Sequence, residues 1–262
     1  MQTIKFHKYH GTGNDFIMID AFHENVALTE EKIQEMCHRR FGIGADGLII
    51  LRKHEGVDFF MDFYNSDGKP GSMCGNGGRC IVAFAHDLGI VSKNTRFVAP
   101  DGPHEAIFYG SDKISLKMNP VKAIETHQKG LFINTGSPHL VVFRNDSSMD
   151  VFREGREIRY SEAYKKEGTN VNFVISDTNV SKIFTYERGV EDETYACGTG
   201  TVASALALNH TKGLPSPIEL KAKGGNLKVY FKKIGAQHYD DIWLEGSAQK
   251  TFSGFYSLDS QK

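Results

Sequence analysis

Two cysteines, each followed by a glycine, stand in the same local sequence at distant points of the chain. Cys74 begins the segment Cys-Gly-Asn-Gly, and Cys197 begins Cys-Gly-Thr-Gly. Each is predicted to lie where a helix begins, and there the backbone N–H groups and the positive end of the helix dipole lower the pKa of a thiol. Glycines at such turns let backbone N–H groups approach an anion closely. The pattern therefore indicates two thiols, each beside a cradle for a carboxylate or a phosphate.

Two such thiols can invert a carbon stereocentre by proton transfer. Inversion needs a base on one face of the carbon and an acid on the other, and two cysteines can exchange these roles with the direction of reaction. Helix N-termini can also stabilise the charge that develops on an α-carboxylate as the α-proton leaves. No metal, water nucleophile or Schiff-base lysine is required. We therefore expect a cofactor-free amino-acid epimerase in which Cys74 and Cys197 act on opposite faces of one carbon.

An internal repeat relates the two cysteines. Three landmarks recur in order: a Thr-Gly turn, a Gly-x-Asp or Gly-x-Asn turn before an apolar run, and the Cys-Gly-x-Gly segment. The offsets are 123 (Gly13 to Gly136), 124 (Gly44 to Gly168) and 123 (Cys74 to Cys197). Because the offset is nearly constant, the sequence predicts two copies of one α/β unit. Copies related by a pseudo-two-fold axis would bring the two cysteines face to face.

Hydrophobic patterns predict many short strands and three helices. Strands are expected at about 4–9, 16–20, 48–51, 59–64, 114–118, 140–143, 171–175, 183–187, 227–231 and 252–257, where β-branched or aromatic runs lie between turn residues. The first helix should run from about 29 to 40, with Thr29 as its N-cap. The other two, 76–88 and 200–210, follow the cysteines and are apolar nearly all round, which is typical of central helices wrapped by sheet.

Composition narrows the class of protein. The 262 residues are 40% hydrophobic and 24% charged, which suits one large globular domain or two of ordinary size. A net charge of -1 and a pI of about 6.8 favour neither nucleic acid nor an anionic membrane surface as a partner. The sequence shows no apolar stretch long enough for a membrane span and no signal-peptide core, so we expect a cytoplasmic protein.

The cysteines have alternative interpretations. Without a signal segment the four of them should be reduced, and the spacing of Cys74 and Cys80, with no Cys-x-x-Cys, does not suit zinc. Cys37 and Cys80 are expected to be inert helix residues. Buried, inert thiols remain the alternative for Cys74 and Cys197, which the repeat and the glycines disfavour. If those two face each other, oxidation to a disulfide would inactivate the protein.

At these residues the sequence resembles the diaminopimelate epimerase family, which interconverts LL- and meso-diaminopimelate without pyridoxal phosphate. The resemblance covers nearly the whole chain and rests on the motifs at 11–16, 42–47, 65–68, 73–80, 138–139, 168–173, 187–189 and 193–200. It implies an α+β fold of two pseudo-symmetric domains, each a curved, mostly antiparallel sheet or barrel around a central helix. We place the domains at 1–119, carrying Cys74, and 120–247, carrying Cys197. The C-terminal strand near 248–262 should return to the first domain.

The resemblance also implies a set of site residues. Substrate contacts would come from Asn14, Asn65, Asn170, Glu187 and Arg188, and from the turns at Gly75, Asn76, Gly198 and Thr199. Arg188 offers a planar fork for a distal carboxylate, and Glu187 can receive an ammonium group. His139 and Glu187 would tune the pKa values of the cysteines. Taken alone, such Asn residues are more often turn formers, an Arg-Glu pair is usually on the surface, and a His after Pro is more often structural.

The sequence departs from the family pattern at two positions, and three other functions were weighed against diaminopimelate epimerisation. Some family members have Asn where this chain has Ser137, or Gln where it has Gly47, so the resemblance does not carry substrate contacts over to these two positions. A two-cysteine racemase for proline or hydroxyproline is the nearest rival, but Asn76 and the Glu187-Arg188 pair favour diaminopimelate. Isomerase relatives without a cysteine pair are disfavoured, and a non-catalytic amino-acid-binding protein is the alternative from another class. The family suggests a homodimer that acts in lysine and peptidoglycan precursor biosynthesis.

Overall fold

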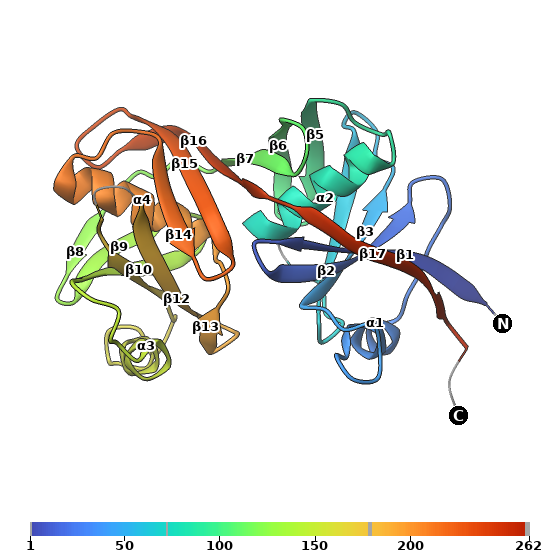
Figure 1. Cartoon of the computed structure of the whole chain (residues 1–262), viewed down its shortest axis with the longest axis horizontal. Coiled ribbons are helices and arrows are strands. Elements are labelled where there is room, and N and C mark those ends of the chain that lie inside the picture. The colour runs from blue at the N-terminus through green and yellow to red at the C-terminus, as the bar shows by residue number, and fades with distance from the viewer. Residues whose placement is uncertain (1, 72, 178–179, 260–262) are drawn as a thin grey trace. The chain divides into compact units, whose positions relative to one another are not determined.

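A computed structural model describes residues 2–71, 73–177 and 180–259, and the chain divides into two compact units (Figure 1). Unit 1 runs to Leu116 and takes up the C-terminal segment from Ser247, and unit 2 is Lys117–Gly246. The ranges expected from the sequence, 1–119 and 248–262, include residues 1, 72 and 260–262, which lie outside the described residues.

Unit 1 is a mixed, mostly antiparallel sheet with two helices. Its elements are β1 (Thr3–Gly11), β2 (Asn14–Ala21), α1 (Glu30–Cys37), β3 (Gly47–Arg52), β4 (Phe59–Asn65), α2 (Gly75–Asp87), β5 (Asn94–Ala99), β6 (Gly102–Phe108), β7 (Lys113–Met118) and β17 (Gln249–Ser257). β17 pairs with β1, and β1 with β2, in antiparallel fashion. The pairs β2–β3 and β4–β5 are parallel, whereas β3–β4, β5–β6 and β6–β7 are antiparallel.

Helix α2 is the central element of unit 1. Every residue from Gly75 to Ala85 is buried, and the helix contacts β1, β2, β3, β6 and β17. An all-round apolar helix is stable only where other elements cover every face, which the strands of unit 1 do. The start of this helix is therefore fixed by the core of the unit.

Unit 2 repeats this arrangement. Its elements are β8 (Glu125–His127), β9 (Gly130–Asn134), β10 (Pro138–Arg144), α3 (Val151–Arg159), β11 (Asn170–Ile175), β12 (Ser181–Glu187), β13 (Asp192–Thr194), α4 (Gly198–Lys212), β14 (Ile218–Ala222), β15 (Gly225–Lys233) and β16 (Tyr239–Ser247). β10–β11 and β12–β14 are parallel, and the other pairs within the unit are antiparallel. Helix α4, buried from Thr201 to Leu208, contacts β9, β10, β11, β12, β14 and β15.

Strand registers confirm the repeat residue by residue. In the parallel pair β2–β3, Phe16 lies opposite Gly47, and in β10–β11, His139 lies opposite Asn170. Adding 123 to the first pair gives the second pair. In the next strand the offset becomes 122, because Ile49 pairs with Phe63 where Asn172 pairs with Thr185. These registers give a list of equivalent positions in the two units.

Two helices differ from the sequence expectation. Helix α1 begins after its predicted N-cap Thr29 but ends at Cys37, short of Arg40, because His38 is extended and its Nδ1 accepts the backbone N–H groups of Arg40 and Phe41. Helix α3 was not predicted, although Asp150 caps it by accepting the N–H of Arg153. No helix within the described residues is both long and apolar enough to cross a membrane.

Candidate active site

Cys74 is the N-cap of α2. Its Sγ accepts a hydrogen bond from the backbone N–H of Gly77 at 3.2 Å, and its carbonyl accepts from Gly78 at 2.8 Å. The side chain is half-buried and belongs to no disulfide. An N–H that points at sulfur, at the positive end of a helix, favours the thiolate over the thiol.

A fully buried arginine supports this helix start. Arg79 Nη1 donates to the carbonyl of Gly75 at 2.9 Å, and Nη2 donates to Thr12 Oγ1 at 3.0 Å and Asn76 Oδ1 at 2.9 Å. Burial lowers the pKa of Arg79 to about 10, against the charges of Cys80 and Cys74, which raise it. Arg79 is therefore still positive at neutral pH and attracts negative charge on the Cys74 sulfur. Its burial was not predicted from the sequence.

Two predicted substrate-binding residues of unit 1 lie together. Asn76 Nδ2 donates to Asn14 Oδ1 at 3.2 Å, and Asn14 Nδ2 donates to Asp46 Oδ2 at 2.6 Å. Asp46 is held in turn by Arg39 at 2.6 Å. The third, Asn65, is exposed at the end of β4, in a turn closed by its backbone bonds to residues 68 and 69.

Cys197 is the N-cap of α4 and is 8% exposed. Its carbonyl accepts from the backbone N–H of Thr201 at 2.9 Å and from the hydroxyl of Thr201 at 2.8 Å. Its Sγ lies 3.5 Å from Thr199 Oγ1. Among the described residues of this turn, the thiol makes no capping hydrogen bond to α4, so the two helix starts treat their sulfurs differently.

A buried polar chain leads away from Thr199. His139 is fully buried, with Nε2 2.9 Å from Thr199 Oγ1 and Nδ1 2.8 Å from Asn172 Oδ1. Asn172 Nδ2 donates to Thr185 Oγ1 at 2.8 Å. Burial lowers the pKa of His139 to about 4, and the charge of Arg188 lowers it too, against the hydrogen bond to Asn172. The ring is neutral at neutral pH.

The sequence itself settles the family. The sequence model described as diaminopimelate epimerase matches residues 6–124 and 131–251. The chain belongs to the diaminopimelate epimerase family. Diaminopimelate epimerase of Flavobacterium psychrophilum is 48% identical over 258 residues, which cover 95% of this chain and 98% of the relative. That of Chlorobaculum tepidum is 44% identical over 259 residues, 95% of this chain and 99% of the relative.

Solved structures show the same fold at low identity. A phenazine biosynthesis protein of the PhzF family from Bacillus anthracis matches with a TM-score of 0.73 and 14% identity, over 98% of this chain and 100% of that one. A hydroxyproline epimerase from Agrobacterium vitis matches with a TM-score of 0.69 and 13% identity, over 99% and 94%. The predicted fold class, two repeated domains of the diaminopimelate epimerase type, is thus confirmed.

The remaining predicted residues of this epimerase lie at the start of β11 and the end of β12 in unit 2. Asn170 Nδ2 donates to the carbonyl of Pro138 at 3.0 Å, and its Oδ1 accepts the backbone N–H of Arg188 at 2.9 Å. Arg188 Nη1 donates to the carbonyl of Glu167 at 2.8 Å. Asn170 therefore retains one N–H and one lone pair for other partners. Glu187 is the last residue of β12, next to Arg188.

The two positions that depart from the epimerase pattern, Gly47 and Ser137, differ in the space around them. A Cβ on Gly47 would lie 2.7 Å from the backbone oxygen of Tyr64 and 2.8 Å from the ring of Phe63. No side chain fits there, so Gly47 makes no side-chain contact and admits none. Ser137 is half-buried, and its carbonyl accepts the N–H of Thr135 at 3.1 Å.

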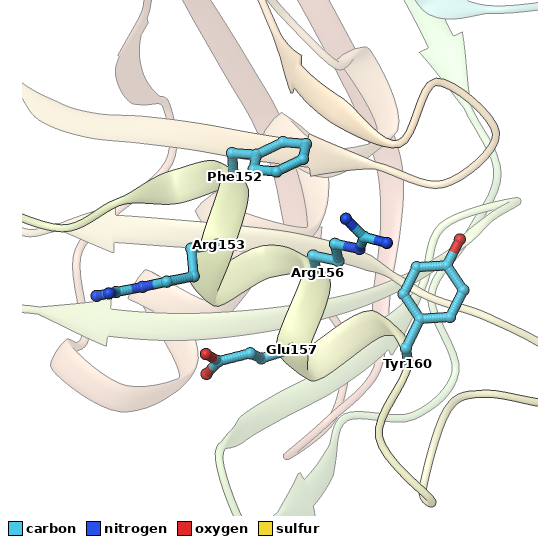
Figure 2. Close-up of a pocket in the computed structure, with 5 residues that line it drawn as sticks. All are labelled: Phe152, Arg153, Arg156, Glu157 and Tyr160. Atoms are coloured by element: carbon cyan, nitrogen blue, oxygen red, sulfur yellow. The ribbon is translucent and has the colours of Figure 1, made fainter.

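A surface pocket of about 420 Å³ lies elsewhere on unit 2, along α3 (Figure 2). It is lined by Phe152, Arg153, Arg156, Glu157 and Tyr160, none of which is a predicted site residue. The Arg156 guanidinium points toward the Tyr160 ring, 6.0 Å from its centroid. Neither Cys74 nor Cys197 lines this pocket. Within the described ranges, no three His, Cys, Asp or Glu side chains gather as metal ligands would.

Proposed function

We propose that this protein interconverts LL- and meso-diaminopimelate by two-base proton transfer through Cys74 and Cys197, without a cofactor. The carrying observation is that the two thiols occupy equivalent N-cap positions of α2 and α4 in a repeat whose strand registers agree. The 48% identity with a diaminopimelate epimerase over nearly the whole chain supports this substrate.

The proposed reaction moves one proton off the substrate and another onto it. The thiolate of one cysteine takes the α-proton, and the C–H electron pair delocalises into the α-carboxylate. The S–H bond of the other cysteine then breaks, and its proton goes to the opposite face of the same carbon. N–H groups of the two helix starts stabilise the transient charge. The cysteines exchange roles in the reverse direction.

In this proposal the remaining predicted residues bind the rest of the substrate. Arg188 takes the distal carboxylate, and Glu187 takes an ammonium group. The amides of Asn14, Asn65 and Asn170 orient the substrate, together with the turns at 75–76 and 198–199. His139 and Glu187 set the balance between thiol and thiolate.

Further parts of the proposal concern the cellular setting. We propose that the protein acts in the cytoplasm as a homodimer, independently of pyridoxal phosphate. Its product would serve lysine and peptidoglycan precursor synthesis. Sedimentation equilibrium of the reduced protein tests the dimer, and a monomer at micromolar concentration would contradict it.

The reaction is tested by isotope exchange. Reduced protein in D₂O should exchange the α-hydrogen of LL-diaminopimelate and produce the meso form. Replacing either catalytic cysteine, Cys74→Ala or Cys197→Ala, should abolish both. Cys37→Ala is the matched control, because Cys37 is buried in α1, where desolvation raises the pKa of its thiol to about 12.

Three outcomes would contradict the proposal. Full activity in either catalytic variant would exclude the two-base mechanism. Exchange with proline or hydroxyproline but not with diaminopimelate would move the assignment to the racemase rival. Binding of diaminopimelate without exchange would indicate a binding protein.

A further inference from the structure

In the buried polar chain of unit 2, which joins Thr199, His139, Asn172 and Thr185, each hydrogen bond has a defined donor and acceptor. Asn172 donates its amide N–H to Thr185, so its Oδ1 is the atom that faces His139 Nδ1. An amide oxygen only accepts, and a neutral imidazole carries one N–H. That N–H therefore lies on Nδ1, and Nε2 is an acceptor. The low pKa of His139, about 4, keeps the ring in this neutral form at neutral pH.

This assignment determines what the hydroxyl of Thr199 can offer to the sulfur of Cys197. Its hydroxyl has a single hydrogen, which it donates to His139 Nε2 at 2.9 Å. Its oxygen then presents only lone pairs to Cys197 Sγ at 3.5 Å. Such an oxygen can accept from S–H but gives nothing to S⁻. The contact stabilises Cys197 as a thiol.

The surroundings of Cys74 favour the thiolate instead. Its sulfur accepts an N–H from Gly77, and the positive charge of buried Arg79 attracts a negative sulfur there. Among the described residues of unit 1, the equivalent positions do not form such a polar chain. The positions equivalent to His139, Asn172 and Thr185 hold Phe16, Ile49 and Phe63.

We infer that Thr199 and Asn172 are positioning residues that hold the proton on Cys197, so that the resting protein carries a thiol at Cys197 and a thiolate at Cys74. The inference rests on the proposed two-cysteine reaction and adds a starting state to it. Asn172 acts by fixing the histidine tautomer, and Thr199 acts by committing its one hydrogen to that ring.

The groups around His139 keep this direction at working pH. Across the sheet it pairs with Ile133 of β9 and Asn170 of β11, and from α4 it meets Thr199, none of which is charged. The charge that acts on the ring is that of Arg188, which lowers its pKa and so opposes protonation. The chain therefore holds its direction until acid charges the ring.

The proton distribution can be read from alkylation of each sulfur. Reduced protein is treated with iodoacetamide across a range of pH, and modification at Cys74 and Cys197 is measured on separate peptides by mass spectrometry. The pH of half-maximal rate reports thiolate formation and does not depend on exposure. We expect Cys74 to reach it about one pH unit below Cys197, a ten-fold difference in thiolate ratio. Equal values, or the reverse order, would overturn the inference.

Variants of Thr199 test its single hydrogen. In Thr199→Ala a water can enter and donate to both His139 and the sulfur, so the half-maximal pH of Cys197 should fall by about one unit. Thr199→Ser keeps the hydroxyl and should retain the original value. Thr201→Ala is the matched control, because that hydroxyl bonds the carbonyl of Cys197 and not its sulfur. An unchanged profile in Thr199→Ala, or an equal shift in Thr201→Ala, would contradict the assignment.

The tautomer provides an independent readout. Nitrogen NMR of protein labelled at histidine should show His139 protonated at Nδ1 and bare at Nε2 at neutral pH. Protonation at Nε2 would overturn the inference. In Asn172→Leu, which removes the acceptor, the bare-Nε2 signal should lose intensity or disappear, and an unchanged tautomer would exclude a role for Asn172.

Neither readout requires turnover. Absence of epimerisation would overturn the proposed function and leave the alkylation and NMR results unaffected. A failure of these results would leave the isotope-exchange result standing.

Discussion

The first turns of α2 and α4 differ in what is buried behind them. Behind α2 lie the charge of Arg79 and an edge-to-face pair of Phe16 and Phe63, whose centroids are 6.0 Å apart. Behind α4, Val202 stands at the position of Arg79, and a neutral polar chain replaces the aromatic pair. Duplication has kept strand register and thiol position, while the side chains around each sulfur have diverged. The repeat is symmetric in backbone and asymmetric in electrostatics.

The largest expected effect comes from removing the charge in unit 1. Arg79→Met deletes the cation near Cys74 and the donors to Gly75 and Asn76, so diaminopimelate exchange should fall about 100-fold, as on loss of one anion-stabilising donor. Exchange kinetics measure this, and alkylation of Cys197 serves as the internal control. A loss of exchange below ten-fold, or an equal change in the alkylation of Cys197, would show that the charge of Arg79 does not act specifically on Cys74.

The second effect is a pH dependence confined to unit 2. His139 has a pKa of about 4 in the folded protein against 6.5 when unperturbed, so between these values the unfolded chain binds more protons. The contribution of neutral His139 to the free energy of unfolding is fully present above pH 6.5, and it falls by roughly 3 kcal/mol as the pH drops toward 4. Replacing it with the residue of unit 1, His139→Phe, should flatten this part of the profile.

Urea unfolding between pH 7 and 4.5, followed by fluorescence, measures the slope. Trp243 is the single tryptophan of the chain and lies in unit 2, so its signal reports that unit. An identical slope in the variant would show that the histidine titrates normally.

Much of the backbone frame could be predicted from the sequence. Each strand expected from hydrophobic runs falls within an observed strand, and both helices after the cysteines begin within two residues of the predicted start. The repeat offset worked because landmarks such as Gly44 and Gly168 need positive φ, at 81° and 77°, which few other residues tolerate. Thr29 was recognisable as a cap because its signal is local.

The environment of each thiol could not be predicted. Asn172 and Thr185 lie in apolar strand runs, and nothing local shows that Asn172 bonds both Thr185 and a histidine of the neighbouring strand. An arginine such as Arg79 is expected on the surface from its residue type, and only the fold shows that it is buried. Helix α3 was missed because Gly155 interrupts a charged segment, and its close approach to Tyr186, 2.4 Å for an added Cβ, is a tertiary fact.

A pair of variants compares the space around equivalent glycines in the two units. A Cβ on Gly200 would lie 2.4 Å from Asn172 Nδ2, whereas on Gly77 its nearest neighbours, Cys74 Sγ and Ile49 Cδ1, are 3.2 and 3.3 Å away. Gly200→Ala should therefore destabilise unit 2 by about 2 kcal/mol through overpacking. Gly77→Ala should stay within about 1 kcal/mol of the original, since helix propensity offsets the tight contact. Equal losses in urea unfolding, followed by circular dichroism, would mean that the two cores pack alike.

The smallest expected effect concerns the outer helices. Asp150→Ala removes the N-cap of α3, and Thr29→Ala removes the N-cap of α1. Each should lower the free energy of unfolding by about 1 kcal/mol. Only Asp150→Ala should shift the unfolding followed by Trp243 fluorescence. A shift from Thr29→Ala of the same size would indicate that the units unfold as one.

The return of β17 to unit 1 has a consequence for synthesis. β1 pairs along nearly its whole length with β17, so unit 1, which begins before unit 2 in the sequence, is completed by a strand that follows unit 2. Unit 2 is continuous, and all of its strands are synthesised before β17. N-terminal domains usually fold first, but unit 1 cannot close β1 against β17 until unit 2 has been made. The half that carries Cys74 therefore receives its last strand only after the half that carries Cys197 has been synthesised.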